Sequence, residues 1–126
     1  MKTPPSPIRK RMLSFRYAFQ GIGRLFQYEP NVRIHAVAGI CVIIAGFLLK
    51  ISAMEWIAIV IVIGLVISAE AFNTAIEKLC DVVSPDYSES IKHIKDMSAG
   101  AVLLTAIASA ITGLIIFIPK ITVIFL

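Results

Sequence analysis

The sequence predicts an all-α integral membrane protein, with an amphipathic surface helix followed by three membrane helices. Its 126 residues favour a single domain spanning 1–126. The chain is 58% hydrophobic and only 16% charged, with a mean hydropathy of +0.88, which is too apolar for an ordinary soluble domain. Long stretches such as Trp56–Ala69 carry no charge at all. The basic residues cluster near the N-terminus, which favours a membrane surface or a topology signal over nucleic acid binding.

The N-terminal 28 residues divide into two expected parts. Residues 1–9 contain three of the six prolines, and we expect them to be disordered. Residues 10–28 are expected to form the surface helix, because at helical spacing the aromatic residues fall on one side and the basic residues on the opposite side. The apolar side of this periodicity is formed by Phe15, Ala18, Phe19, Ile22, Leu25 and Phe26.

Three membrane helices are expected over residues 30–51, 55–81 and 91–118. Pro30 places Glu29 at a break before the first of them, and Pro119 is expected to end the last. A helix needs about 20 residues to cross the hydrocarbon. The second helix reaches that length only if Glu70 and Glu77 lie within it.

The distribution of basic residues predicts the orientation of these helices. Three spans place the N-terminus and the loop 79–96 on one side of the membrane, together with most of the lysines and arginines. The other side has only Lys50 and Lys120. The positive-inside rule therefore places the N-terminus in the cytoplasm. Cys41 and Cys80 are expected to be free thiols.

Four polar side chains form a stripe along the second membrane helix. Glu70, Asn73, Glu77 and Asp81 fall within about 80° of arc at helical spacing. Glu70 is the deepest, about 10 Å from Glu77 along the helix axis. An acid at such depth costs a few kcal/mol or more and usually marks a functional site. We expect no basic residue of the spans at the depth of Glu70, so pairing for packing alone is the less favoured interpretation.

The residue types around this stripe are those needed for phosphoryl transfer. Glu29 and Glu77 are carboxylates on different elements, and carboxylates with open positions suit Mg²⁺. Lys92, Lys95 and Asp96 open the third span, where cations and a helix N-terminus favour phosphate. This pattern suggests a kinase acting on a membrane alcohol. An ion-coupled transporter or channel subunit stays open, because buried acids also mark ion paths and the chain has no P-loop or protein-kinase motif.

Two segments resemble a known family. "EAFNTAIEKLCD" and "KDMSAGAVLL" resemble the two signatures of the small bacterial integral-membrane lipid kinases, the prokaryotic diacylglycerol kinases and undecaprenol kinases. The resemblance extends from about Lys10 to Lys120. It implies a homotrimer in the bacterial cytoplasmic (inner) membrane, with composite active sites and Mg-ATP-dependent phosphorylation of a lipid alcohol at the cytoplasmic face.

The resemblance also implies roles for individual residues. Glu70 matches the catalytic base, Asn73 an asparagine that supports the acid and phosphate groups, and Glu29 and Glu77 the Mg²⁺ ligands. Ala99 occupies a lipid-contacting position that is serine in diacylglycerol kinases. The positions that match ATP-contacting residues are Lys10, Tyr17, Asp86, Ser88, Lys95 and Asp96.

The sequence indicates the lipid substrate less specifically than it indicates the kinase family. "RIHAVAG" and "GLIIFIPK" look more like the undecaprenol kinases, so undecaprenol is the expected substrate and diacylglycerol the alternative. His35, within the first of these segments, is expected to be a satisfied histidine near a helix start, with a place along the lipid path as the second interpretation.

Overall fold

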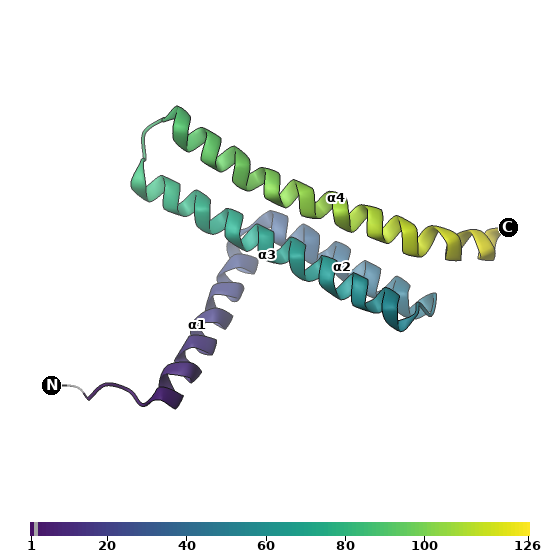
Figure 1. Ribbon diagram of the computed structural model, residues 1–126, viewed down its shortest axis with the longest axis horizontal. Coiled ribbons are helices and arrows are strands. Elements are labelled where there is room, and N and C mark those ends of the chain that lie inside the picture. The colour runs from purple at the N-terminus through teal and green to yellow at the C-terminus, as the bar shows by residue number, and fades with distance from the viewer. Residues whose placement is uncertain (2) are drawn as a thin grey trace.

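The computed structural model describes residue 1 and residues 3–126; Lys2, one of the N-terminal cations, lies outside the described residues. The regular structure of the described residues consists of α1 (Pro7–Tyr28), α2 (Pro30–Leu48), α3 (Ala53–Val83) and α4 (Glu89–Phe125). The long helices α3 and α4 pack side by side, and α2 lies against α3 (Figure 1). α1 leaves this bundle at an angle and carries the N-terminus away from it (Figure 1).

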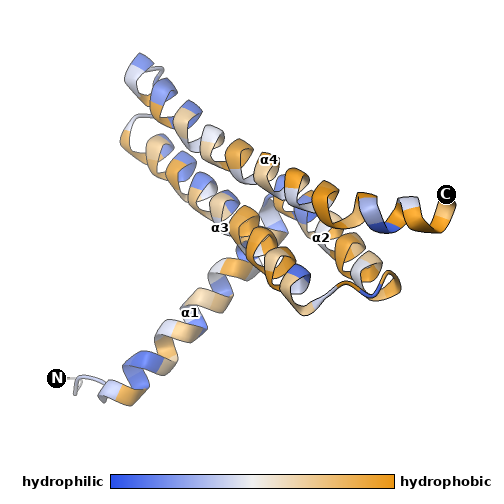
Figure 2. Cartoon of the chain, turned by 45° about the vertical axis from the view of Figure 1, so that its right-hand side comes forward, coloured by the Kyte–Doolittle hydropathy of each residue, from blue (hydrophilic) through white to orange (hydrophobic). Residues whose placement is uncertain are grey.

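Three of the four helices, α2, α3 and α4, are long and apolar enough to cross a membrane. For the described residues, this confirms the prediction of an all-helical chain with three helices long and apolar enough to cross a membrane. Figure 2 shows that apolar residues dominate the middle of the bundle, whereas polar residues gather along α1 and at the end where α3 meets α4. At a rise of 1.5 Å per residue, the 31 residues of α3 exceed the roughly 30 Å of hydrocarbon. α3 is therefore longer than one crossing of the hydrocarbon requires.

The start of α1 differs from the sequence-based expectation of disorder over residues 1–9. The helix begins at Pro7, three residues earlier than expected, because Ser6 caps it. The Ser6 hydroxyl accepts a hydrogen bond from the Arg9 N–H at 3.3 Å, and proline is well suited to the first helical position. At the other end Glu29 is extended (φ −108°, ψ 104°), as expected for a residue before proline. This break turns the chain from α1 into α2.

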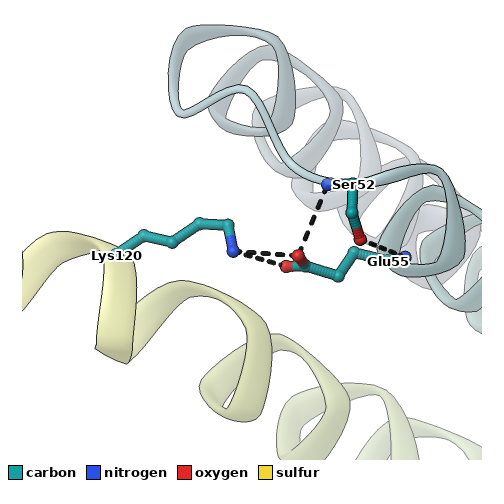
Figure 3. Close-up of polar contacts among 3 residues, drawn as sticks. All are labelled: Ser52, Glu55 and Lys120. Carbon is teal, nitrogen blue, oxygen red and sulfur yellow. Dashed lines mark hydrogen bonds and ion pairs between the residues drawn. The ribbon is translucent and has the colours of Figure 1, made fainter.

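The α2–α3 turn is tied to α4 by a polar contact at the end of the bundle opposite the α3–α4 connection. Ser52 and Glu55 form a reciprocal capping box at the start of α3, and the Lys120 Nζ lies 2.7 Å from Glu55 Oε2 (Figure 3). The expected stop at Pro119 is wrong, since α4 continues through this proline to Phe125. The proline removes one backbone donor from the helix, and the ion pair holds the residue directly after it against α3.

The buried core of the bundle is small and lies near this turn. Its centre is formed by Ile51, Ile59 and Ile116, against which Trp56 and Phe117 also pack. Many large apolar side chains of α2, α3 and α4 face outward instead. Such a surface is compatible with lipid or with further protein chains, but not with water.

Candidate functional site

The polar stripe of α3 becomes steadily less buried toward the α3–α4 connection. Glu70 is only 4% exposed and Thr74 is 7% exposed, whereas Glu77 is half-buried and Asp81 is exposed. The stripe thus runs from the interior of the bundle to the polar end of the molecule. Glu70 lies against His35 of α2, whereas Asp81 lines the hollow at the α3–α4 connection, where its side chain is exposed.

Glu70 contacts a histidine of the neighbouring helix. The His35 Nε2 lies 3.2 Å from Glu70 Oε1, and the two side chains are 28% and 5% exposed, respectively. The expectation that no basic residue lies at the depth of Glu70 is therefore wrong. The signal was present in the sequence, because counting helix rise from the α2–α3 turn places residues 35 and 70 about 6 Å apart in depth.

Asn73 lies one turn beyond Glu70 on the same face and contains a buried acceptor. Its Oδ1 atom receives no hydrogen bond from any described part of the chain. A buried polar atom without a partner is costly, and native proteins rarely keep one without a reason. Asn73 Oδ1 is thus a buried acceptor that no described group of this chain satisfies.

Glu29 lies beside the same half of α3, although it comes from the break between α1 and α2. It lines a hollow of about 470 Å³ between α1 and α3, together with Leu25, Tyr28, Thr74 and Lys78. Glu77 does not line this hollow. Neither carboxylate, Glu29 nor Glu77, forms an ion pair within the described residues.

A second hollow, of about 290 Å³, lies at the polar end of the bundle where α3 connects to α4. It brings together the predicted ATP-contacting residues Asp86, Ser88, Lys95 and Asp96. Ser88 also begins α4, because its hydroxyl accepts a hydrogen bond from the Ile91 N–H at 3.4 Å. The first turn of this long helix, whose free N–H groups favour anions, therefore opens beside the hollow.

Two ion pairs fix the charged side chains of this hollow. Lys95 Nζ lies 2.7 Å from Asp81 Oδ1, and Lys92 Nζ lies 2.7 Å from Asp96 Oδ2. These residues precede the uncharged part of α4 and lie outside the membrane-spanning segment. The hydrogen bond to Asp81 raises the pKa of Lys95, and the hydrogen bond from Lys92 lowers the pKa of Asp96. Both shifts favour the charged form, the ammonium of Lys95 and the carboxylate of Asp96.

The remaining predicted site residues are not brought to this hollow within one chain. Lys10 and Tyr17 are exposed on α1, which runs away from the α3–α4 connection (Figure 1). Ala99 is exposed on α4, beside the buried Ser98. The two hollows thus collect the predicted residues of the helix break and of the α3–α4 connection, but not those of α1.

A family model described as prokaryotic diacylglycerol kinase matches residues 16–117. The chain belongs to the prokaryotic diacylglycerol kinase family. The family resemblance predicted from the two sequence signatures is confirmed, and the protein is a lipid kinase. Of the predicted site residues, only Lys10 lies outside the matched range.

The chain is similar in sequence to several lipid kinases of this family. It is 42% identical to an undecaprenol kinase of Bacillus subtilis (strain 168) over 107 residues, which cover 85% of this chain and 87% of that protein. It is 40% identical to a diacylglycerol kinase of Synechocystis over 109 residues, covering 86% of this chain and 62% of that protein. Identity to the diacylglycerol kinase of Escherichia coli (strain K12) is 28% over 100 residues, 79% of this chain and 82% of that protein.

Membership of a lipid-kinase family changes how the buried acid of α3 is interpreted. An ion-coupled transporter and a kinase both account for an acid at membrane depth, and the sequence pattern alone left both open. The family match favours the kinase. Phosphoryl transfer requires a base, a phosphate site and positioning of the acceptor, and the described residues offer an acid at depth with a cationic hollow nearer to water.

Proposed function

We propose that this protein phosphorylates undecaprenol at the cytoplasmic face of the bacterial inner membrane, with ATP as the phosphate donor. The observation that carries this proposal is the position of Glu70, a carboxylate that is 4% exposed on a membrane helix whose polar stripe leads toward a cationic hollow. A lipid alcohol reaches such a depth from the membrane, whereas ATP reaches the hollow from water. The N-terminus and the α3–α4 connection then lie in the cytoplasm, as the charge distribution favours.

In this mechanism Glu70 acts as the general base. Its carboxylate takes the proton of the lipid hydroxyl as the hydroxyl oxygen attacks the terminal phosphorus of ATP, and the bond between that phosphorus and the β,γ-bridging oxygen breaks, so that ADP leaves and the lipid phosphate forms. Asn73 supports the reacting groups, and its unpartnered buried Oδ1 favours that role. Ala99 contacts the lipid, and its exposure on α4 leaves it accessible from the membrane. The cost of burying Glu70 is thus tied to the depth of the substrate hydroxyl.

The cationic hollow at the α3–α4 connection holds the phosphates and the nucleotide. Lys95 supplies a positive point charge that is kept protonated by Asp81, and the start of α4 adds backbone N–H groups. Asp86, Ser88 and Asp96 line the same hollow and contact the nucleotide. Lys10 and Tyr17 of α1 complete this site.

We propose that Glu29 and Glu77 are the protein ligands of a bound Mg²⁺ ion. Both are half-buried, both lack an ion-pair partner within the described residues, and Mg²⁺ prefers oxygen ligands. When bound, this ion would neutralise charge on the phosphate oxygens. Glu29 lines the larger hollow at the α1–α2 break, whereas Glu77 lies on α3 outside that hollow.

We further propose a homotrimer with composite sites. What supports it is the separation of Lys10 and Tyr17 from the α3–α4 hollow within one chain, together with the many outward-facing apolar side chains of the three membrane helices (Figure 1). In a trimer, α1 of one chain completes the nucleotide site of another. The small residues of α4 permit the close helix packing that such an assembly needs.

The second candidate substrate is diacylglycerol. The observation that favours it is the 40% identity to the Synechocystis diacylglycerol kinase, only slightly below the identity to the undecaprenol kinase. Both lipids present a hydroxyl at the membrane surface, so the same base and the same phosphate site serve either one. The two substrates differ in the tail that the membrane helices contact.

The test is a side-by-side phosphorylation assay with the purified protein in mixed micelles. Each reaction contains Mg-ATP and either undecaprenol or diacylglycerol, and transfer of labelled phosphate to the lipid is measured. We expect a higher kcat/KM for undecaprenol, and we expect Glu70→Gln to lower kcat by about 10²- to 10⁴-fold. A higher kcat/KM for diacylglycerol would support the second candidate. Absence of phosphate transfer to both lipids would overturn the proposed function.

A further inference from the structure

The contact between His35 and Glu70 joins the deepest acid of the stripe to a different helix. The imidazole nitrogen lies 3.2 Å from the carboxylate oxygen. Glu70 is otherwise enclosed, with 4% of its surface exposed. Within the described residues, no lysine or arginine pairs with this carboxylate. Among the described residues, His35 is thus the one basic side chain that lies against this carboxylate.

A catalytic carboxylate has to face the hydroxyl whose proton it removes. A side chain with free rotation about its torsions spends only part of its time in that orientation. A nitrogen held against one carboxylate oxygen restricts this rotation, and it leaves the second oxygen available to the lipid hydroxyl.

We infer that His35 is a positioning residue for phosphoryl transfer, which holds the Glu70 carboxylate directed toward the lipid hydroxyl. This inference rests on the proposed function, in which Glu70 is the base. His35 itself touches neither ATP nor phosphate, and it acts through Glu70. Its position one helix away fits this role, because α2 packs against α3 and fixes the imidazole relative to the carboxylate.

The neighbourhood of His35 supports a held side chain rather than a freely moving one. His35 also lines a narrow hollow of about 110 Å³ between α2, α3 and α4, whose other walls include Gly39, Val66 and Ser109. Gly39 is buried one helical turn from His35, and the nearest atoms to a Cβ built there belong to the Ile63 side chain of α3, the closest at 3.6 Å. α2 and α3 are therefore in van der Waals contact next to the imidazole.

The test compares three substitutions of His35 in the undecaprenol phosphorylation assay. His35→Leu removes the nitrogen and keeps an apolar side chain of moderate size. His35→Gln places an amide nitrogen at a reach similar to Nε2, whereas the shorter His35→Asn does not. We expect kcat to fall about 10- to 100-fold for His35→Leu and His35→Asn, and to stay within about threefold of wild type for His35→Gln. The KM values for ATP and lipid should change by no more than about twofold.

Two controls separate this role from a general loss of structure. His93→Leu replaces the only other histidine of the chain, which is exposed, and it should leave kcat within about twofold of wild type. In a Glu70→Gln background, His35→Leu should lower the remaining rate by no more than about twofold, because the group through which it acts is gone. Each variant is first compared with wild type by thermal unfolding in the same detergent.

The possible results are distinct. Wild-type activity of His35→Leu would overturn the inference, and so would equal inactivity of His35→Leu and His35→Gln in folded protein. A change confined to KM would also overturn it, because it would assign His35 to substrate binding. Failure of the wild-type protein to phosphorylate either lipid would instead overturn the proposed function.

Discussion

Lys95 of α4 and Asp81 of α3 form an ion pair with a separation of 2.7 Å between Nζ and Oδ1. The pair joins the two helices at the polar end of the bundle, on one wall of the hollow at the α3–α4 connection. Both side chains are partly or largely exposed, so the pair itself adds little stability. The ion pair instead positions the side chain of Lys95, because it holds the ammonium group at the mouth of the proposed nucleotide site.

Replacing Lys95 by methionine should weaken ATP binding. The change removes a charge that contacts phosphate while it retains most of the apolar stem, and a hydrogen bond to a charged group contributes about 1.5–3 kcal/mol. We therefore expect the KM for ATP to rise about 10- to 100-fold, with a smaller effect on the KM for the lipid. Steady-state kinetics with varied ATP measure this change.

The matched control for this substitution is Lys50→Gln, at the opposite end of the bundle. Lys50 lies in the α2–α3 turn and is exposed, so its removal should leave the KM for ATP within about twofold of wild type. Equal effects of the two substitutions would assign them to net charge rather than to the hollow.

Replacing Glu77 by glutamine should raise the concentration of Mg²⁺ needed for activity. An amide keeps the shape of the side chain but loses the charge that a hard cation requires. We expect the half-saturating Mg²⁺ concentration to rise at least about tenfold, and the same result is expected for Glu29→Gln. Mg²⁺ titrations of phosphoryl transfer at fixed ATP provide the measurement, with Glu89→Gln in the exposed first turn of α4 as the control. An unchanged requirement in both variants would remove these residues from the metal site.

The composite site predicts recovery of activity when two inactive variants assemble together. Tyr17→Ala damages the part of the site on α1, and Glu70→Gln removes the base on α3. If these parts come from different chains, randomly mixed trimers made from equal amounts regain intact sites in about a quarter of positions. Co-reconstitution from denatured protein followed by the kinase assay measures this recovery. Mixed assemblies without any recovered activity would indicate that each chain carries its own complete site.

The two buried glycines of α2 should respond differently to alanine. A Cβ at Gly46 would lie 2.7 Å and 3.0 Å from the Trp56 ring, whereas at Gly39 the closest atom would be 3.6 Å away. We expect Gly46→Ala to destabilise the protein by about 1–3 kcal/mol, because the indole packs against the core and must move. Gly39→Ala should be close to neutral, because the contact is ordinary and alanine favours the helix. Thermal unfolding in detergent distinguishes the two variants.

The polar stripe of α3 could be predicted from the sequence alone. Its period of 3.6 residues placed Glu70, Asn73, Glu77 and Asp81 on one helix face, and the burial gradient follows that pattern. Local helical geometry alone determines which residues of one helix share a face, so this part needed no tertiary information. The break at Glu29 was predictable for a similar reason, because proline restricts the residue before it.

The end of α4, unlike the break at Glu29, depends on a contact with a residue far away in the sequence. Pro119 predicted a stop, yet α4 continues to Phe125 while Lys120 contacts Glu55 on a helix 65 residues earlier in the chain. A proline costs one helical hydrogen bond, and whether the helix continues depends on what holds the residues beyond it. That partner lies far away in the sequence, so no local pattern reveals it.

The sequence by itself determined the helices, their membrane-crossing length and the identity of the polar stripe, because hydropathy, helical period and proline position act within one segment. Only the tertiary structure decided which partner each polar residue meets. It placed His35 against Glu70, joined Lys95 to Asp81, gathered Asp86, Ser88 and Asp96 around one hollow and left Lys10 and Tyr17 apart. The physical reason is that contacts between helices depend on packing and register in three dimensions, which the period of a single helix does not specify.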